Sequence, residues 1–322
     1  MAEIRSVEMS LGQRLLTLRR RRLIVVTGKG GVGKSLLSVA IGRMLAKAGR
    51  RTLVLEVDPR ENLHPLLGTA PSGGEVVAAG DRLYLQNLKP REVADWVVRK
   101  QVKIEMLVQR VLDSPVYHRF VDGAPGLREM AILGHVLRLL RGETKKAPRV
   151  DTVVLDAPAT GHGVYLLTSA RLYADAIGQG PFAGLAREIA DFASDPEQTS
   201  VTVVTLAEEM PVQEAIELRG SLLEKFGREP ELLVVNGLYP PSPEGATDDG
   251  RIEPSAAVDE EAMQALWRRR RAVNERELER LAEGWPSPSL KLPLMPMEPG
   301  PPLVEALVER IEQAMLAGGG DS

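Results

Sequence analysis

The segment from Gly28 to Ser35 constrains this chain more than any other part of its sequence. It reads Gly-Lys-Gly-Gly-Val-Gly-Lys-Ser, directly after the apolar run Leu23–Val26 and before the helix-like stretch Leu36–Ala46. Glycines let backbone N–H groups turn inward around phosphate oxygens, and the N-terminus of the next helix adds the positive end of its dipole. Lys34 would then contact the β- and γ-phosphates, and the Ser35 hydroxyl would bind Mg²⁺. The segment predicts a nucleoside-triphosphate site between a strand and a helix.

A dinucleotide site is the alternative interpretation of the same glycines. Gly28, Gly30 and Gly33 satisfy G-x-G-x-x-G, and the acidic Glu56 follows near the position of a ribose contact. A dinucleotide site has no need for a lysine followed by a hydroxyl, whereas Lys34-Ser35 complete the pattern G-x4-G-K-S. We therefore favour the triphosphate and keep a dinucleotide-binding oxidoreductase as the lesser alternative.

Composition excludes several other classes of site. The net charge of −3 gives no general attraction to nucleic acid, and no apolar run approaches the ~18 residues that cross a bilayer. The first residues carry no apolar signal region, so we expect a cytoplasmic protein without nucleic-acid partners or direct membrane insertion. The chain has no cysteine, which excludes disulfides, thiolate zinc sites and thiol-bound metalloids. The four histidines stand far apart, and we expect each to be a surface or packing residue.

Strands alternate with helices along most of the chain. We expect strands at Leu23–Thr27, Thr52–Val57, Arg82–Leu88, Val150–Leu155, Val201–Leu206, Leu232–Val235 and Leu290–Leu294. We expect helices at Val7–Arg20, Leu36–Ala46, Val164–Ala176, Phe182–Phe192, Val212–Phe226, Ala256–Glu283 and Leu303–Leu316. Several strands are continuous β-branched runs, which are typical of strands buried on both faces. The pattern predicts an α/β fold with a mostly parallel, doubly wound sheet.

We expect residues 1–322 to form a single domain with insertions. From Pro90 to Arg141 apolar residues recur at helical spacing over a stretch too long for a simple crossover. Residues 90–148 and 163–198 are therefore interpreted as an inserted helical subdomain beside the phosphates. Residues 238–256 are rich in Pro, Gly and Asp and predict an exposed loop, and we expect 318–322 to be a disordered tail.

Two aspartates follow predicted strands. Asp156 ends the apolar run Val153–Leu155, the position from which a carboxylate holds the Mg²⁺ shell, and its alternative role is to cap the following turn. Asp58 ends the strand beside the loop, where it could orient the attacking water near the γ-phosphate. Its alternative role is a simple Asp-Pro turn.

Lys29, early in the loop, carries a family resemblance. The sequence K-G-G-V-G-K-S resembles the loop of the deviant Walker A ATPases. In that group this lysine reaches across a dimer interface to the partner's nucleotide, so the resemblance implies that dimerisation and hydrolysis are coupled. It would make Lys29, with Lys34 and Asp58, a catalytic residue.

Further segments narrow the resemblance to the ArsA-like family, which includes the arsenite pump ATPase and the targeting factor for tail-anchored proteins. Residues 58–63 resemble its first switch, D-P-A-H-[SN]-L, and residues 156–162 resemble its second, D-T-A-P-T-G-H. Asn236 matches the family's adenine-contacting asparagine. Residues 293–300 resemble its adenine loop, P-L-x-x-x-E-x-x-G, with one residue fewer before Gly300.

The resemblance implies a set of contacts and partners. The nucleotide would be ATP with Mg²⁺, and the chain would form a homodimer or a heterodimer with a paralogous ATPase. Ser35 and Asp156 would bind the metal. The residues expected to contact the nucleotide are Gly28, Lys29, Gly30, Gly31, Val32, Gly33, Lys34, Ser35, Leu36, Asn236, Pro293 and Leu294.

The chain also departs from the family pattern. The first switch has Arg60-Glu61 where the family has Ala-His, and the second has Ala157-Pro158-Ala159 where Thr-Ala-Pro is expected. A shifted proline changes which backbone amides face the γ-phosphate, which predicts hydrolysis that is slow or depends on a partner. An ATP-binding regulatory subunit is the alternative. Without cysteine, the pump's metalloid-binding thiols and the targeting factor's bridging zinc site cannot exist, so we expect no activation by arsenite.

The helical stretch leaves the question of a protein client open. A groove for hydrophobic segments is expected to be rich in methionine, but only Met106 and Met130 lie between Pro90 and Arg141. A packed helical cap is favoured, and a client groove is the alternative. The last helix carries Glu305, Glu309 and Glu312 and lacks the basic face of a membrane-surface helix.

Overall fold

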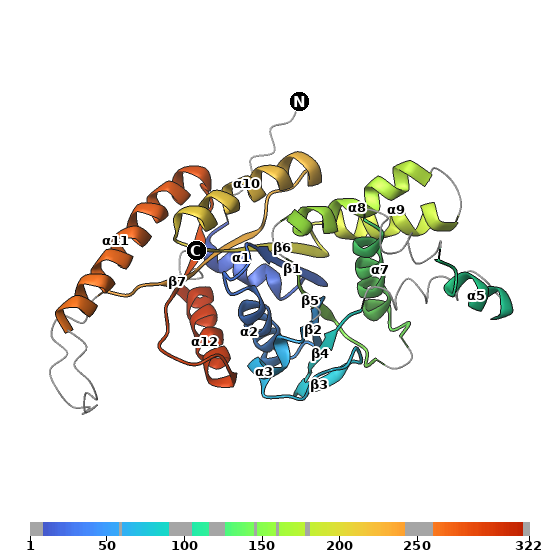
Figure 1. Ribbon diagram of the computed structural model, residues 1–322, viewed down its shortest axis with the longest axis horizontal. Coiled ribbons are helices and arrows are strands. Elements are labelled where there is room, and N and C mark those ends of the chain that lie inside the picture. Colours follow the sequence, from blue (N-terminus) through green and yellow to red (C-terminus); the bar gives the residue numbers. More distant parts are fainter. Residues whose placement is uncertain are drawn as a thin grey trace.

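The computed structural model describes residues 9–57, 60–89, 105–115, 126–144, 147–158, 161–177, 181–241 and 260–317. Within these ranges eight strands form one sheet in the order β3-β4-β2-β5-β1-β6-β7-β8 (Figure 1). The strands are β1 (Leu23–Gly28), β2 (Thr52–Glu56), β3 (Val77–Gly80), β4 (Leu83–Asn87), β5 (Thr152–Asp156), β6 (Thr199–Leu206), β7 (Leu232–Leu238) and β8 (Ser289–Pro293). Every pairing is parallel except that of β3 with β4. The predicted mostly parallel α/β sheet is confirmed.

Helices cover both faces of this sheet. One face packs against α1 (Leu11–Leu18), α2 (Lys34–Lys47), α3 (Leu63–Leu67) and α12 (Pro301–Ala317). The other packs against α7 (Leu127–Arg141), α8 (Gly161–Ile177), α9 (Pro181–Ser194) and α10 (Glu209–Phe226). The helices α5 (Glu105–Leu112) and α11 (Glu260–Gly284) lie toward opposite ends of the molecule (Figure 1).

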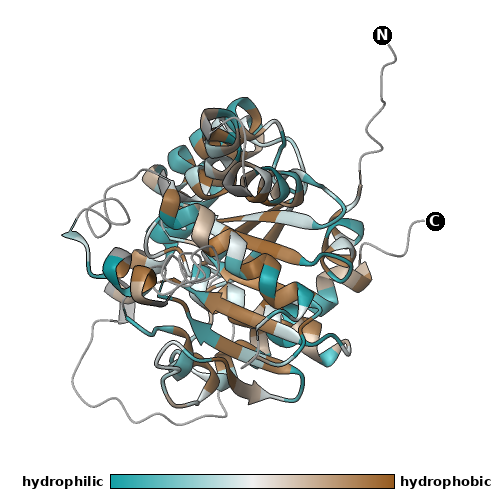
Figure 2. Cartoon of the chain, turned by 90° about the vertical axis from the view of Figure 1, so that its right-hand side faces the viewer, coloured by the Kyte–Doolittle hydropathy of each residue, from teal (hydrophilic) through white to brown (hydrophobic). Residues whose placement is uncertain are grey.

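The central strand shows why its sequence is continuously apolar. Leu23 and Val25 belong to the core on one face of the sheet, whereas Ile24 and Val26 belong to the core on the other. All four are fully buried. Each such side chain contributes about 1.5–3 kcal/mol on burial, so a strand between two helical layers is stabilised on both sides. Figure 2 shows these strands as hydrophobic ribbons in the interior, with hydrophilic segments on the helices around them.

One local expectation is corrected, and two short elements appear that the sequence did not predict. The first helix is shorter than Val7–Arg20: it begins after Ser10, whose hydroxyl accepts from the Gln13 N–H while the Gln13 side chain accepts from the Ser10 N–H, a capping box that fixes the start. Strand β3 was not expected, because three of its four residues, Val-Ala-Ala-Gly, are types depleted in strands, and it is held by antiparallel pairing with β4. The short helix α3 was also not expected.

Some expectations fall outside the described residues. Most of the stretch 90–126, the loop 242–259 and the tail 318–322 are in this position. Leu238, placed in the loop 238–256 by sequence, instead ends β7. The subdomain boundaries 90–148 and 163–198 stay predictions. Among the described helices, none has both the length and the apolar character needed to cross a bilayer.

Candidate functional site

The site lies where three neighbouring parallel strands end. Strand β5 lies between β1 and β2, so the loop that follows β1 is beside Asp156 of β5, with Glu56 of β2 one strand further away. In a dinucleotide-binding fold the second strand neighbours the first. The observed strand order therefore disfavours the dinucleotide interpretation. The carboxylate that lies beside the glycine loop comes from the adjacent strand β5.

The loop turns sharply into α2 at Gly33. Gly33 is the N-cap of α2 with φ +94°, and a Cβ there would lie 2.3 Å from Asn236 Nδ2. Asn236 Nδ2 in turn donates to the Val32 carbonyl oxygen at 3.0 Å, which fixes the loop to β7. Because glycine supplies no capping side chain and the first turn of α2 has no acidic residue, its N–H groups are open to an anion.

Lys34 lies at the first position of α2 and folds back over the loop. Its Nζ donates to the Lys29 carbonyl oxygen at 2.8 Å. Burial lowers the pKa of the Lys34 ammonium, and the nearby charge of Asp156 partly opposes this. A partly desolvated cation at a helix N-terminus is suited to bind phosphate oxygens.

Two hydroxyls of α2 hold the carboxylate of Asp156. Ser35 Oγ donates to Oδ2 at 2.6 Å, and Ser38 Oγ donates to Oδ1 at 3.2 Å. A hydroxyl and a carboxylate are hard oxygen ligands of the kind that Mg²⁺ prefers, so Ser35 and Asp156 fit the predicted metal. Among the described residues no group of three or more His, Cys, Asp or Glu could hold a metal by itself. Mg²⁺ would therefore take its remaining ligands from water and phosphate.

Lys29 points away from its own loop toward α10. Its Nζ lies 2.9 Å from Glu214 Oε1, and both side chains are partly exposed. The predicted role of Lys29 lies across a dimer interface, and in the single chain its ammonium is instead held by Glu214.

Glu56 is the acidic residue of the dinucleotide alternative, but its carboxylate is engaged in hydrogen bonds within the protein. Its two carboxylate oxygens lie 3.0 and 3.1 Å from the Asn62 backbone N, and Asn87 Nδ2 donates to Oε2 at 3.2 Å. The side chain is buried, which raises the pKa of its carboxyl to about 7, although the bonds from Asn62 and Asn87 oppose the rise. Glu56 therefore anchors the chain that follows residue 58. Asp58 itself, and residues 159 and 160 of the second switch, lie outside the described residues.

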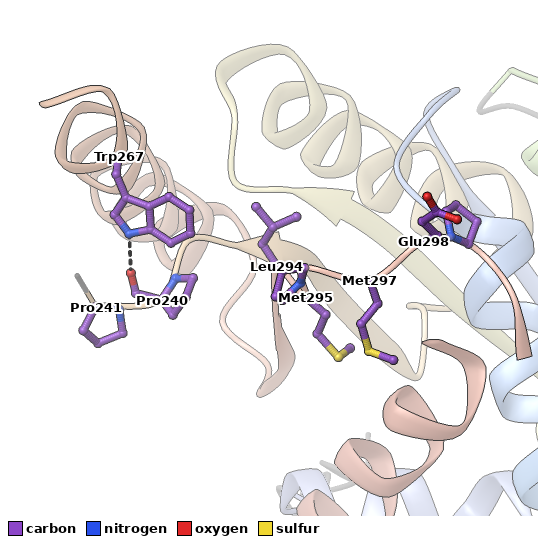
Figure 3. A pocket seen from close by; sticks show the side chains of 9 residues that line it. Pro240, Pro241, Trp267, Leu294, Met295, Met297 and Glu298 are labelled. Carbon is purple, nitrogen blue, oxygen red and sulfur yellow. Dashed lines mark hydrogen bonds between the residues drawn. The ribbon is translucent and has the colours of Figure 1, made fainter. Parts of the chain in front are cut away.

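A cavity of about 790 Å³ opens beyond the end of β7 (Figure 3). Leu294, an expected adenine contact, is one of its walls, and the neighbouring Pro293 ends β8. Trp267 of α11 forms the opposite wall, and its Nε1 donates to the Pro240 carbonyl oxygen at 3.0 Å. The remaining lining residues are Pro241, Met295, Pro296, Met297, Glu298 and Pro299.

The sequence did not identify several of these residues. Ser38 follows Ser35 by three positions and so shares its face of the helix, a signal that could have been used. Glu214 and Trp267 come from distant helices and carry no local motif. Only the folded chain brings them to the loop and to the cavity.

Comparisons with known proteins agree with this geometry. A family model described as anion-transporting ATPase matches residues 21–179, which contain the loop, both switches and Asp156. The chain is 29% identical to ATPase BagA of Mycobacterium tuberculosis over 215 residues, covering 61% of this chain and 59% of BagA.

Two arsenical pump-driving ATPases are also similar to the chain. The one from Escherichia coli is 26% identical over 257 residues, which cover 74% of this chain and 42% of the pump protein. The one from Acidiphilium multivorum is 28% identical over 232 residues, which cover 66% of this chain and 39% of the pump protein. The chain thus spans about three fifths or less of the length of these relatives. Together with the loop, the strand order and the Ser35–Asp156 contact, these similarities support an ArsA-like P-loop ATPase.

Proposed function

We propose that this chain binds ATP with Mg²⁺ at the loop Gly28–Ser35, hydrolyses it, and works as a nucleotide-switched dimer. The observation that carries the proposal is the meeting of Lys34, Ser35 and Asp156 at the open N-terminus of α2. An ammonium, a hydroxyl and a carboxylate around such a helix end are the groups that phosphoryl transfer requires from a protein. The relatives named as ATPases support the same reaction.

Each residue has a separate part in the proposed reaction. Lys34 would exchange its bond to the Lys29 carbonyl for the β- and γ-phosphate oxygens. Ser35 and Asp156 would hold Mg²⁺, which when bound neutralises charge that develops on the phosphates. Asp58 would orient the attacking water. The hydroxyl of Ser38 would keep the Asp156 carboxylate in place.

The adenine of ATP would lie on the side of the loop that faces β7 and β8. Asn236 is tied to the loop through Val32, and the chain after it leads to Pro240 at the cavity. An apolar cavity with proline, leucine and aromatic walls suits the flat face of a purine. We propose that adenine binds between Asn236 and the segment Pro293–Leu294, on the Leu294 side of this cavity.

The proposed dimer rests on Lys29, whose role in the family it resembles is to contact the nucleotide of a partner chain. In a single chain its ammonium is paired with Glu214, so action on a partner's nucleotide requires that this pair open. Partly exposed ion pairs contribute only about 0–1 kcal/mol, which a dimer interface can readily replace. The dimer could be formed by two copies of the chain or with a paralogous ATPase. Since the chain has no cysteine, we propose that arsenite does not activate it.

The variant Lys29→Ala tests the proposed action across the dimer. We expect ATP affinity, measured by calorimetry, to stay within about twofold, because Lys34 and the loop amides remain. Turnover should fall at least about a hundredfold, as expected when a cation that stabilises the transition state is removed. Lys225→Ala, an exposed lysine near the C-terminal end of α10, is the matched control and should keep wild-type turnover. Full turnover in Lys29→Ala would contradict the action across the dimer.

A regulatory subunit is the second candidate function. It is favoured by the departures Arg60-Glu61 and Ala157-Pro158-Ala159 from the family's switch sequences. Such a subunit would bind ATP and depend on a paralogous partner for hydrolysis. Brisk ATP turnover by the purified protein alone would exclude it.

A further inference from the structure

Glu61, in the first switch, holds a turn that begins eleven residues further along the chain. Its Oε1 accepts from the Gly73 backbone N–H at 2.9 Å, and its Oε2 accepts from the Ser72 backbone N–H. Bonds from N–H groups to a carboxylate are roughly twice as strong as those between neutral groups. We call Glu61 with the N–H groups of Ser72 and Gly73 the switch clamp. In the family's switch sequence a histidine stands where this chain has Glu61, and imidazole cannot accept two such bonds at once.

Glu56 holds the other end of the segment between the first switch and this turn. Its carboxylate accepts from the Asn62 N–H and from Asn87, and the Asn87 backbone N–H donates to Ser72 Oγ at 2.9 Å. The first switch is therefore held at two points: Glu56 of β2 binds the Asn62 N–H, and Glu61 of the switch binds the N–H groups of the turn. Ser72 connects the two contacts, because its N–H donates to Glu61 and its Oγ accepts from Asn87, which also binds Glu56.

From the turn, hydrogen bonds continue to α7. Gln86 Nε2 donates to the Gly74 carbonyl oxygen at 2.9 Å, and Gln86 Oε1 lies 3.0 Å from His135 Nε2. Because the Gly74 carbonyl can only accept, the orientation of the Gln86 amide is settled, and His135 Nε2 must carry the proton that it donates. Gln86 and His135 are both buried. Buried polar groups that are fully paired specify one relative position of the elements that carry them.

The turn contains two glycines. Gly73 and Gly74 have φ of +62° and +97°, a backbone region that glycine enters freely and in which it can change conformation at low cost. A displacement of Glu61 can therefore shift the 72–74 turn without breaking the helix α3 before it or the strand β3 after it. Gln86 and His135 would carry such a shift from the turn to α7.

We propose that Glu61 is a positioning residue that ties the first switch to the Ser72–Gly74 turn, so that movement of the switch on nucleotide binding reaches α7 through Gln86 and His135. The proposal rests on the proposed function, since ATP must bind for the switch to move. It adds to that function a named route toward the helical part of the chain and a role for a residue that departs from the family pattern.

The test compares wild-type protein with Glu61→Ala and Glu61→Gln. Asp81→Asn is the matched control, because it removes the same charge from the exposed turn between β3 and β4, away from the clamp. Three quantities are measured: the affinity for Mg-ATP by calorimetry, kcat, and hydrogen exchange of α7 amides with and without Mg-ATP. We expect Mg-ATP to change exchange in α7 of the wild-type protein and of Asp81→Asn.

Glu61→Ala should bind Mg-ATP within about twofold of wild type, lose the α7 response, and show kcat lowered about tenfold. Glu61→Gln should lie between the two, because one amide oxygen can accept one of the two N–H bonds. If Glu61→Ala does not fold, the intermediate response of Glu61→Gln carries the test. Mg-ATP binding with an unchanged α7 response in both variants would overturn the proposed route alone. Failure of the wild-type protein to bind Mg-ATP would overturn the proposed function and the route together.

Discussion

His135 is a buried ionisable side chain whose protonation the fold opposes. Burial lowers the pKa of its imidazole to about 4 from the ordinary 6.5, and the charge of Arg138 adds to the effect. The unfolded chain takes up a proton near pH 6.5, whereas the folded chain does so only near pH 4. Stability that is present above pH 6.5 is therefore lost as the pH falls through this window, by up to roughly 3 kcal/mol.

The variant His135→Gln tests this pH dependence. Glutamine can still donate to Gln86 but takes up no proton. We expect the free energy of unfolding of the wild-type protein to fall by roughly 3 kcal/mol more than that of the variant between pH 7 and pH 4. Denaturant unfolding at a series of pH values measures this difference. An equal loss in the two proteins would contradict the account of His135.

Single residues differed in how well the sequence predicted them. Lys34, Ser35 and Asp156 lie together at the start of α2, as expected from their local patterns of a loop before a helix and a carboxylate after an apolar strand, and their roles stay predictions. Glu56 was considered only as a ribose contact, because its burial against Asn62 depends on strand order. The partner of Lys29 could not be predicted, because Glu214 belongs to a helix far along the chain.

The turn between β1 and α2 depends on glycine at one position more than at another. At Gly33 an alanine would have to adopt φ +94°, and its Cβ would displace Asn236. We expect Gly33→Ala to lower the free energy of unfolding by roughly 1–3 kcal/mol and to weaken Mg-ATP binding. Gly30→Ala, where a Cβ would meet no described atom within 4 Å, should change stability by less than about 0.5 kcal/mol. Thermal unfolding of both variants measures the contrast, and equal losses would contradict it.

Whole elements were predicted where their sequence carried its own signal. The strands β1, β5 and β7 contain continuous apolar runs, β6 is rich in the β-branched residues Val and Thr, and the sequence located each to within a few residues. The sequence did not predict strand β3, because alanine and glycine have no strand preference and the segment becomes a strand only through its pairing with β4. The start of α1 was placed too early because the capping box at Ser10 was overlooked.

The whole molecule places the loop Gly28–Ser35 at the carboxyl-end edge of the parallel strands, in a sheet that is covered by helices on both faces. The rigid strands β1, β5 and β2 fix Lys34 and Asp156, while the first switch and the 72–74 turn lie at the margin of the same edge. Helices α7, α8 and α9 share one hydrophobic core with the sheet. A change at the loop can therefore reach the helical layer through packed and hydrogen-bonded contacts rather than across a flexible linker.

Titration of Mg-ATP into the folded protein by calorimetry tests the central claim most directly. The account predicts saturable binding of one nucleotide per chain in the wild-type protein and no measurable binding in Lys34→Ala. Lys47→Ala, at the far end of the same helix, where Lys47 pairs with Glu305, should bind like wild type. Absence of binding by the wild-type protein, or unchanged binding by Lys34→Ala, would contradict the account.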